Sequence, residues 1–143
     1  MGKERAIVWF TSFINTFKKG STKVVRPMAE LAWFHRIVTE DYDKAIQIYE
    51  EILAMEFKDV DSENIDENLS GCRLELADLI FQTFRASSNP KEKLVLLEKM
   101  RKLPDLRTRS NKTKTANWNN WEESYANVML ALMTRTVSSP IKY

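Results

Sequence analysis

The residue types that most often carry out chemistry in proteins are scarce in this sequence. It contains one histidine, His35, and one cysteine, Cys72, among 143 residues. Acid–base and nucleophilic catalysis need such a group within hydrogen-bond reach of a partner, and no partner motif accompanies either residue. His35 lies on an apolar helix face and Cys72 in an apolar stripe, so we expect both to be structural. The sequence therefore predicts no catalytic residue and no enzyme.

Metal ligands are also few. One cysteine with one histidine cannot form a conventional zinc site within one chain, and a single cysteine excludes an internal disulfide. Carboxylates gather over residues 59–67, but this stretch lacks the glycine and terminal glutamate of a helix-loop-helix calcium loop. The carboxylates are Asp59, Asp61, Glu63, Asp66 and Glu67. We expect a solvated acidic turn there, with no metal and no cofactor.

The stretch of residues 101–114 is basic and could bind phosphate, an acidic protein surface or a nuclear import receptor. Because Pro104 ends the helix before it, we expect an exposed polar loop over residues 105–117. The candidate basic residues of this loop are Arg107, Arg109, Lys112 and Lys114. Trp118 and Trp121 follow and could stack nucleobases. A nucleic-acid-associated helical protein is therefore the alternative function, although a net charge of +2 means that such binding, or binding to an anionic membrane, must be local.

Composition favours one all-α domain over residues 1–143. Hydrophobic residues make up 43% and charged residues 29%, which is an ordinary globular balance. Three glycines and four prolines are too few to separate the many short strands of a sandwich or barrel. No apolar run approaches the roughly 18 residues of a membrane span, and no secretory cleavage site follows the first residues. We expect a cytoplasmic or nuclear protein.

Apolar periodicity predicts about six helices and no strand. The predicted helices cover residues 3–17 (within an amino-terminal segment 1–20), 28–39, 41–55, 62–86, 89–103 and 118–137. The helix at residues 41–55 has the clearest division into an apolar and a charged face. Asn89 and Pro90 provide an N-cap and a first helical position, and Glu92 is placed for a capping-box-like arrangement.

The helix at residues 41–55 resembles the second helix of a tetratricopeptide repeat. In that repeat a small residue lets two helices approach closely, and an aromatic residue four positions later locks them together. Ala45 and Tyr49 occupy these repeat-packing positions here. The resemblance implies antiparallel helical hairpins over residues 27–57 and 62–104, stacked as a short α-solenoid.

The sequence departs from the repeat pattern at several positions. The large aromatic residue of the first helix falls on Ala29, and the small residue at its crossing point falls on Trp33. In the second hairpin, Lys93 falls near the expected small residue. Trp121, with Tyr125 following, resembles the opening of a third repeat that lacks its second helix. An irregular helical bundle is the alternative architecture, and it is also all-α.

The resemblance implies a protein–protein interaction module, an adaptor or an assembly subunit of a complex. Helical repeats line their inner surface with first helices and leave a groove for a partner. That surface would carry Glu30, Phe34, Ile37 and Val38. Repeats that clamp chaperone carboxylates have an asparagine where Phe34 falls, so we expect a groove suited to an amphipathic helix or a hydrophobic peptide. The alternative is that Phe34 and Ile37 simply pack against the first helix.

The last predicted helix offers a second surface, because no further helix follows to cover its aromatic stripe. This stripe contains Trp118, Trp121, Tyr125, Val128 and Met129. Aromatic side chains often dominate the energetics of interfaces. We expect the stripe to pack on the preceding hairpin, to bind a second copy and form a homo-oligomer, or to receive a protein partner.

Overall fold

The computed structural model describes residues 2–58, 65–106, 109–110 and 118–138 of the chain. In these parts the chain forms six α-helices: α1 (Gly2–Ile14), α2 (Val25–Phe34), α3 (Tyr42–Leu53), α4 (Ile65–Ala86), α5 (Pro90–Lys102) and α6 (Asn120–Ser138). Short helical turns η1 (Thr22–Val24), η2 (His35–Thr39) and η3 (Leu103–Asp105) extend or join them. The prediction of an all-α fold is confirmed, and the helices lie within a few residues of the predicted ranges.

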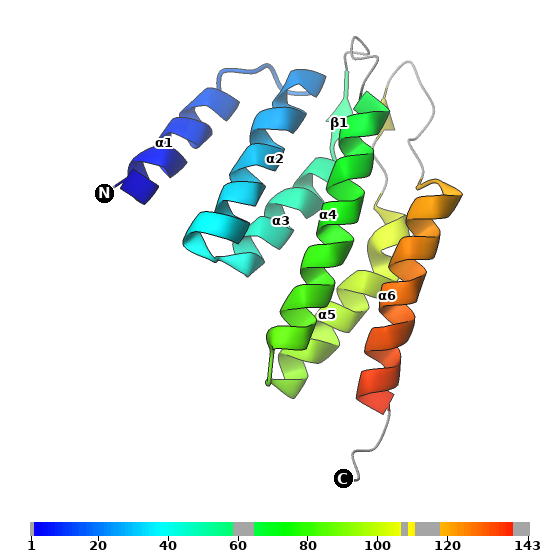
Figure 1. Ribbon diagram of the computed structural model, residues 1–143. Coiled ribbons are helices and arrows are strands. Elements are labelled where there is room, and N and C mark those ends of the chain that lie inside the picture. Colours follow the sequence, from blue (N-terminus) through cyan, green and yellow to red (C-terminus); the bar gives the residue numbers. More distant parts are fainter. Residues whose placement is uncertain (1, 59–64, 107–108, 111–117, 139–143) are drawn as a thin grey trace.

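The helices form two layers (Figure 1). Helices α2, α4 and α6 run side by side in the same direction and form the front layer, while α3 and α5 run the opposite way behind them. Each helix from α2 to α6 packs against the next one in the sequence, and α4 also contacts both α2 and α6. The front layer therefore presents three parallel helices on one side of the molecule, and α1 lies beyond α2 at its edge.

Two short strands depart from the prediction that the chain has none. β1 (Glu56–Phe57) pairs in parallel with β2 (Arg109–Ser110). Each strand has only two residues, too few to produce a period-two pattern in the sequence. The pairing adds no sheet layer to the fold. It joins the segment after α3 to the segment after η3.

The turn between α2 and α3 sets the angle of this hairpin. After the π-helical turn η2, Glu40 adopts a left-handed conformation with φ of 56° and donates its backbone N–H to the carbonyl of His35. Asp41 then caps α3, where its carboxylate accepts a hydrogen bond from the backbone N–H of Lys44 at 3.1 Å. Ala45 and Tyr49, the expected packing residues of α3, are 0% and 2% exposed. Both are therefore core residues.

The hydrophobic core lies between the two layers. Its fully buried side chains come mainly from α3 to α6 and include Ile52, Leu53, Leu76, Ile80, Met100 and Met133. In α5 Leu94 is 54% exposed, whereas Leu96 is buried. Leu96 and Met100, four residues apart, share the face of α5 toward the core, and Leu94 lies off that face. Helix α1 contributes no buried residue.

Candidate functional site

An ion-pair network joins α2 to α4 on the front layer. Nη1 of Arg36 in η2 donates to Oε2 of Glu75, and Nη2 donates to Oδ2 of Asp78, each at 2.7 Å. Burial alone would lower the pKa of Arg36, but its hydrogen bonds with Asp78 and Glu75 and the charges of both carboxylates raise it overall. The Arg36 side chain is largely buried, whereas Glu75 and Asp78 remain 40% and 31% exposed. One guanidinium thus holds two solvent-accessible carboxylates.

Aromatic side chains extend this network on both sides. On α2, the ring centroid of Trp33 lies 5.9 Å from Cζ of Arg36. On α6, burial raises the pKa of Tyr125, and the negative charges of Asp78 and Glu75 raise it further. Trp121 stacks on Tyr125, with ring centroids 6.0 Å apart and planes at 21°. These side chains come from all three helices of the front layer, and α4 packs against both α2 and α6.

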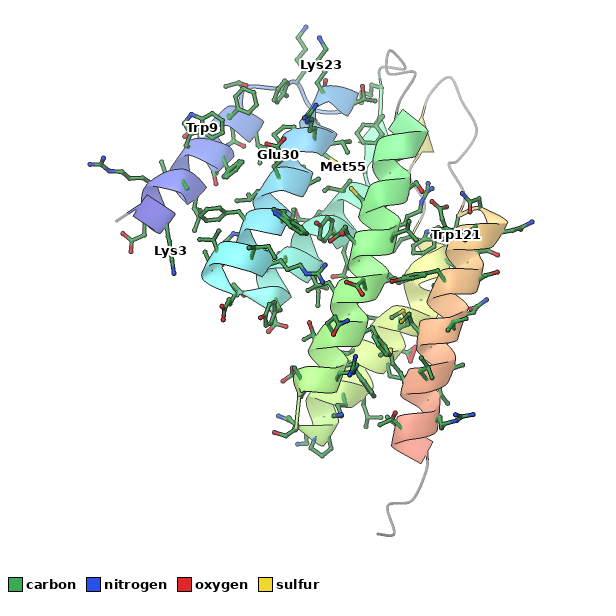
Figure 2. The ribbon with its side chains drawn as sticks, in the orientation of Figure 1. Lys3, Trp9, Lys23, Glu30, Met55 and Trp121 are labelled. Carbon is green, nitrogen blue, oxygen red and sulfur yellow. The ribbon has the colours of Figure 1, made fainter. Side chains whose placement is uncertain are left out.

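We name this set the front cluster. It comprises Trp33, Arg36, Glu75, Asp78, Tyr125 and Trp121. Its two tryptophans provide large exposed apolar surface, since Trp33 is 49% exposed and Trp121 is 64% exposed. Figure 2 labels Glu30 on α2 and Trp121 on α6, on either side of α4. The front cluster therefore offers an aromatic and acidic surface that spans three helices.

The expected groove residues on α2 and η2 divide into two groups. Ile37 and Val38 are exposed, and Glu30 is exposed and paired with Arg26 at 3.2 Å. Phe34 is half-buried, and its ring lies 5.8 Å from that of Phe10 in α1. Phe34 thus packs against Phe10 of α1, which is the alternative left open for this residue, whereas Ile37 is exposed.

A cavity beside Arg36 continues the surface toward the end of α4. Its volume is about 300 Å³. It opens between η2 and the last turns of α4 and is lined by Arg36, Ile37, Tyr42, Leu79, Gln82, Thr83 and Ala86. Both polar and apolar groups line it, so it could accept one side chain of a bound segment next to the front cluster.

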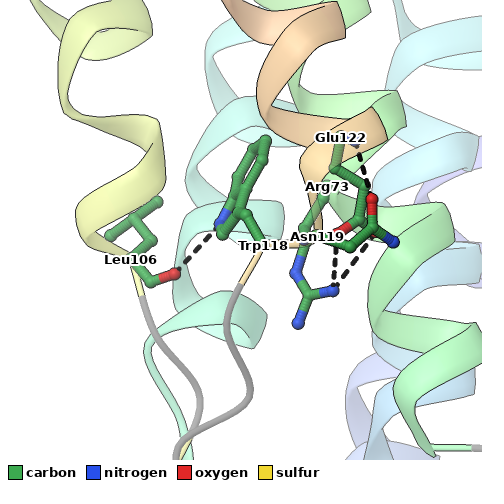
Figure 3. Close-up of polar contacts among 5 residues, drawn as sticks. All are labelled: Arg73, Leu106, Trp118, Asn119 and Glu122. Atoms are coloured by element: carbon green, nitrogen blue, oxygen red, sulfur yellow. Dashed lines mark hydrogen bonds and ion pairs between the residues drawn. The ribbon is translucent and has the colours of Figure 1, made fainter.

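Trp118 differs most from the sequence prediction. It was expected on the exposed stripe of the last helix, but it is 4% exposed and precedes α6 (Figure 3). Its Nε1 donates a hydrogen bond to the carbonyl oxygen of Leu106 at 3.2 Å. Trp118 is therefore a packing residue and cannot serve as a partner contact or as a platform for nucleobases.

A buried ion pair fixes the start of α6. Glu122 is 0% exposed, and its carboxylate accepts hydrogen bonds from Nη1 of Arg73 in α4 at 3.0 and 3.2 Å. The same carboxylate accepts the backbone N–H of Asn119, while the side chain of Asn119 accepts the backbone N–H of Glu122 (Figure 3). This is a capping box, one turn from Tyr125. It holds the aromatic stripe of α6 in a fixed position over α4.

Sequence reasoning missed this capping box, although its signal is present. The stretch Asn119-Asn120-Trp121-Glu122 has a capping residue and a glutamate at the required spacing. The sequence instead indicated a capping box at Asn89. There the side chain accepts the backbone N–H groups of Lys91 and Glu92 at 2.9 and 3.4 Å.

The two side chains most suited to catalysis, those of His35 and Cys72, are both buried. His35 is buried at the end of α2, and its Nδ1 lies 2.9 Å from Oγ1 of Thr39. Cys72 is buried in α4, and burial raises the pKa of its thiol to about 12. Among the described residues no group of three or more potential ligands is placed to hold a metal ion.

Most of the two charged stretches lies outside the described residues. This applies to Asp59, Asp61 and Glu63 of the acidic turn and to Arg107, Lys112 and Lys114 of the basic loop. The backbone of Arg109 forms part of β2, and the backbones of Asp66 and Glu67 form part of α4. The described helices include none long and apolar enough to cross a membrane.

Comparison with known proteins gives no relative from which to transfer a function. No protein-family model, no curated protein and no solved structure matches this chain.

Proposed function

We propose that this protein is a non-enzymatic protein-binding module, of tetratricopeptide-like architecture, that acts as an adaptor or assembly subunit in the cytoplasm or nucleus. The partner segment lies across the front cluster, over α2, α4 and α6. One observation carries the proposal: on the front layer, Trp33 and Trp121 remain about half or more exposed on either side of α4, which an ordered ion-pair network joins to the end of α2. Exposed aromatic anchors around a rigid centre are typical of interaction surfaces.

The charges of the front cluster define the partner further. Arg36 neutralises only one of the two carboxylates it binds, so the centre of the surface keeps an excess negative charge. A bound segment would place a lysine or arginine near Glu75 and Asp78 and apolar side chains on Trp33 and Trp121. An amphipathic helix or extended peptide that combines apolar and basic residues fits this pattern.

The alternative of nucleic-acid binding has no support from the described residues. Its proposed platform needed both Trp118 and Trp121, and Trp118 is buried. The remaining exposed surface around Trp121 is acidic because of Glu75 and Asp78, which repel phosphate.

Selection from a random peptide library on the purified protein tests the proposal. Selected peptides should be enriched in basic and apolar residues. Their affinity, measured by fluorescence anisotropy, should fall at least about 30-fold in a Trp33→Ala/Trp121→Ala variant, since the loss of even one interface anchor costs about 2 kcal/mol.

The matched control is Leu94→Ala/Val95→Ala, which removes two similarly exposed apolar side chains from the back layer. Its peptide affinity should equal that of the wild type, and circular dichroism should show all variants to be helical. Equal weakening by both double variants, or no peptide selected at all, would overturn the proposal. A concentration-dependent dimer that the Trp121 variant abolishes would instead assign this surface to a second copy of the chain.

A further inference from the structure

The first 29 residues have a charge pattern unlike the rest of the chain. They contain one acidic residue, Glu4, and six basic ones: Lys3, Arg5, Lys18, Lys19, Lys23 and Arg26. Their net charge is therefore +5, whereas residues 30–143 carry −3 within the total of +2. The weak overall charge conceals a strongly basic amino-terminal region.

Helix α1, in the same region, exposes apolar side chains. Val8 is 64%, Trp9 60% and Phe13 41% exposed. The rings of Trp9 and Phe13 stack with centroids 5.4 Å apart and planes at 11°, so they form one apolar ridge. The adjoining side of α1 packs on α2 through half-buried residues such as Phe10, whose ring lies 5.3 Å from that of Trp9. The apolar surface of α1 is thus wider than its contact with the protein requires.

The position of α1 makes this ridge accessible to a large flat partner. α1 is the outermost helix of the array, beyond α2 (Figure 1). Figure 2 shows Lys3 and Trp9 on α1 and Lys23 beyond its carboxyl-terminal end. Lys3, Arg5, Lys18 and Lys23 are all exposed, so positive charge lies at both ends of the aromatic ridge.

We propose that α1 binds the anionic surface of a lipid bilayer, with Trp9 and Phe13 inserted at the headgroup level and the flanking lysines and arginines against acidic headgroups. Helices that lie in a membrane interface combine an aromatic ridge with basic residues in this way, and they need no membrane-spanning length. Tryptophan in particular prefers the interface.

The geometry favours a bilayer over an acidic protein or a nucleic acid. The ridge lies on the outermost helix of the array, and exposed basic residues are spread over both ends of α1, so the distribution of charge matches a broad anionic surface. A nucleic acid would satisfy the charges but would leave Val8, which is 64% exposed on the same helix, without an apolar environment. This surface is separate from the front cluster, so the proposal does not depend on peptide binding there.

Co-sedimentation of the full chain with phosphatidylcholine vesicles, with and without phosphatidylserine, tests the proposal. Binding should need phosphatidylserine and weaken at high salt. A Lys18→Glu/Lys19→Glu variant should bind at least about 25-fold more weakly, because each basic residue at an anionic surface contributes roughly fivefold. The matched control is Lys44→Glu/Lys91→Glu, which changes two exposed lysines of α3 and α5 by the same charge and should bind like the wild type.

Trp9→Ser/Phe13→Ser tests insertion, with Trp121→Ser as the control for an equally exposed tryptophan elsewhere. The first variant should lose vesicle binding while remaining helical, and the second should retain it. In the wild type, brominated lipids should quench the fluorescence of Trp9. The Trp9→Phe variant should still bind vesicles, but this quenched part of the tryptophan fluorescence should be absent from it.

Three results would overturn the proposal. The first is no binding to phosphatidylserine vesicles at low salt, and the second is equal binding by Trp9→Ser/Phe13→Ser and the wild type. The third is a vesicle-independent dimer, detected by light scattering and lost in the same variant, which would assign the ridge to contact between two copies of the chain.

Discussion

The helices at the two ends of the array, α6 and α1, are attached to it in different ways. Helix α6 is held by the buried pair of Arg73 and Glu122, by a capping box and by the fully buried Met133. Helix α1 has no buried residue and rests on α2 through half-buried aromatic contacts. Trp121 on α6 and Trp9 on α1 are nevertheless almost equally exposed, at 64% and 60%.

This comparison shows that exposure alone does not define a binding surface. Trp121 belongs to a helix whose first turn is fixed by a charged pair and a capping box, so its position on the front layer is set before a partner arrives. Preorganisation of this kind reduces the entropic cost of recognising a specific segment. Helix α1 lacks such an anchor, which suits a partner without a defined shape, such as a lipid surface.

The largest difference between the two ends should appear when the anchor of α6 is broken. Glu122→Ala leaves the Arg73 guanidinium buried without its carboxylate and removes one half of the capping box. The loss of one partner from a buried ion pair costs about 3–5 kcal/mol. We expect this decrease in the free energy of unfolding, measured by urea denaturation.

Two further variants sharpen this result. Arg26→Ala, which breaks the exposed pair with Glu30, should cost at most about 1 kcal/mol. Arg73→Met/Glu122→Gln should be less destabilised than Glu122→Ala, because it removes the buried charges together and keeps a glutamine in the capping box. A cost below about 1 kcal/mol for Glu122→Ala would show that α6 is not anchored by this pair.

Truncation of one side chain on each end helix should give an intermediate difference. Met133→Ala removes a side chain that is 0% exposed, so it should cost about 2–5 kcal/mol. Phe10→Ala removes a half-buried ring from the contact between α1 and α2, and about 1–2 kcal/mol is expected since less apolar area leaves the protein interior. Urea denaturation measures both costs. Equal costs would remove the distinction between the two ends.

The sequence was sufficient to predict most of the helical framework. The period of the apolar residues gave α3 almost residue by residue, because a single amphipathic face is its main determinant. The resemblance to the second helix of a tetratricopeptide repeat implies packing roles for Ala45 and Tyr49, and both side chains are buried. Local patterns of this kind are readable because the interacting residues lie within a few turns of each other.

The front cluster was only partly predictable, because it joins residues far apart in the chain. Trp121 and Tyr125 were identified from the stripe of one helix, but Arg36, Glu75 and Asp78 are ordinary charged helix residues until α2 and α4 lie side by side. Trp118 was misplaced for a related reason. Its burial depends on a hydrogen bond to Leu106, across a segment that has no sequence periodicity.

The smallest expected effect is a pH dependence at the α1 end. Burial lowers the pKa of His35 from 6.5. The negative charge of Asp41 raises this pKa by a smaller amount, and the positive charge of Lys44 lowers it slightly. The ring centroids of His35 and Phe34 are 6.2 Å apart, and the ring of Phe34 in turn contacts Phe10 of α1. This end of the array therefore contains a titratable group that the folded state prefers to keep neutral.

The direction of the effect follows from linkage. As the pH falls through 6.5, the unfolded chain takes up a proton on His35 that the folded protein binds less readily, so the free energy of unfolding decreases. Above this pH both states are neutral and the contribution of His35 is constant. In His35→Asn, whose amide can replace Nδ1 beside Thr39, this part of the decrease should be absent. Urea denaturation of both proteins on either side of pH 6.5 measures the difference. Parallel pH profiles would show that His35 titrates alike in the folded and unfolded chain. The histidine would then make no contribution to the pH dependence of the free energy of unfolding.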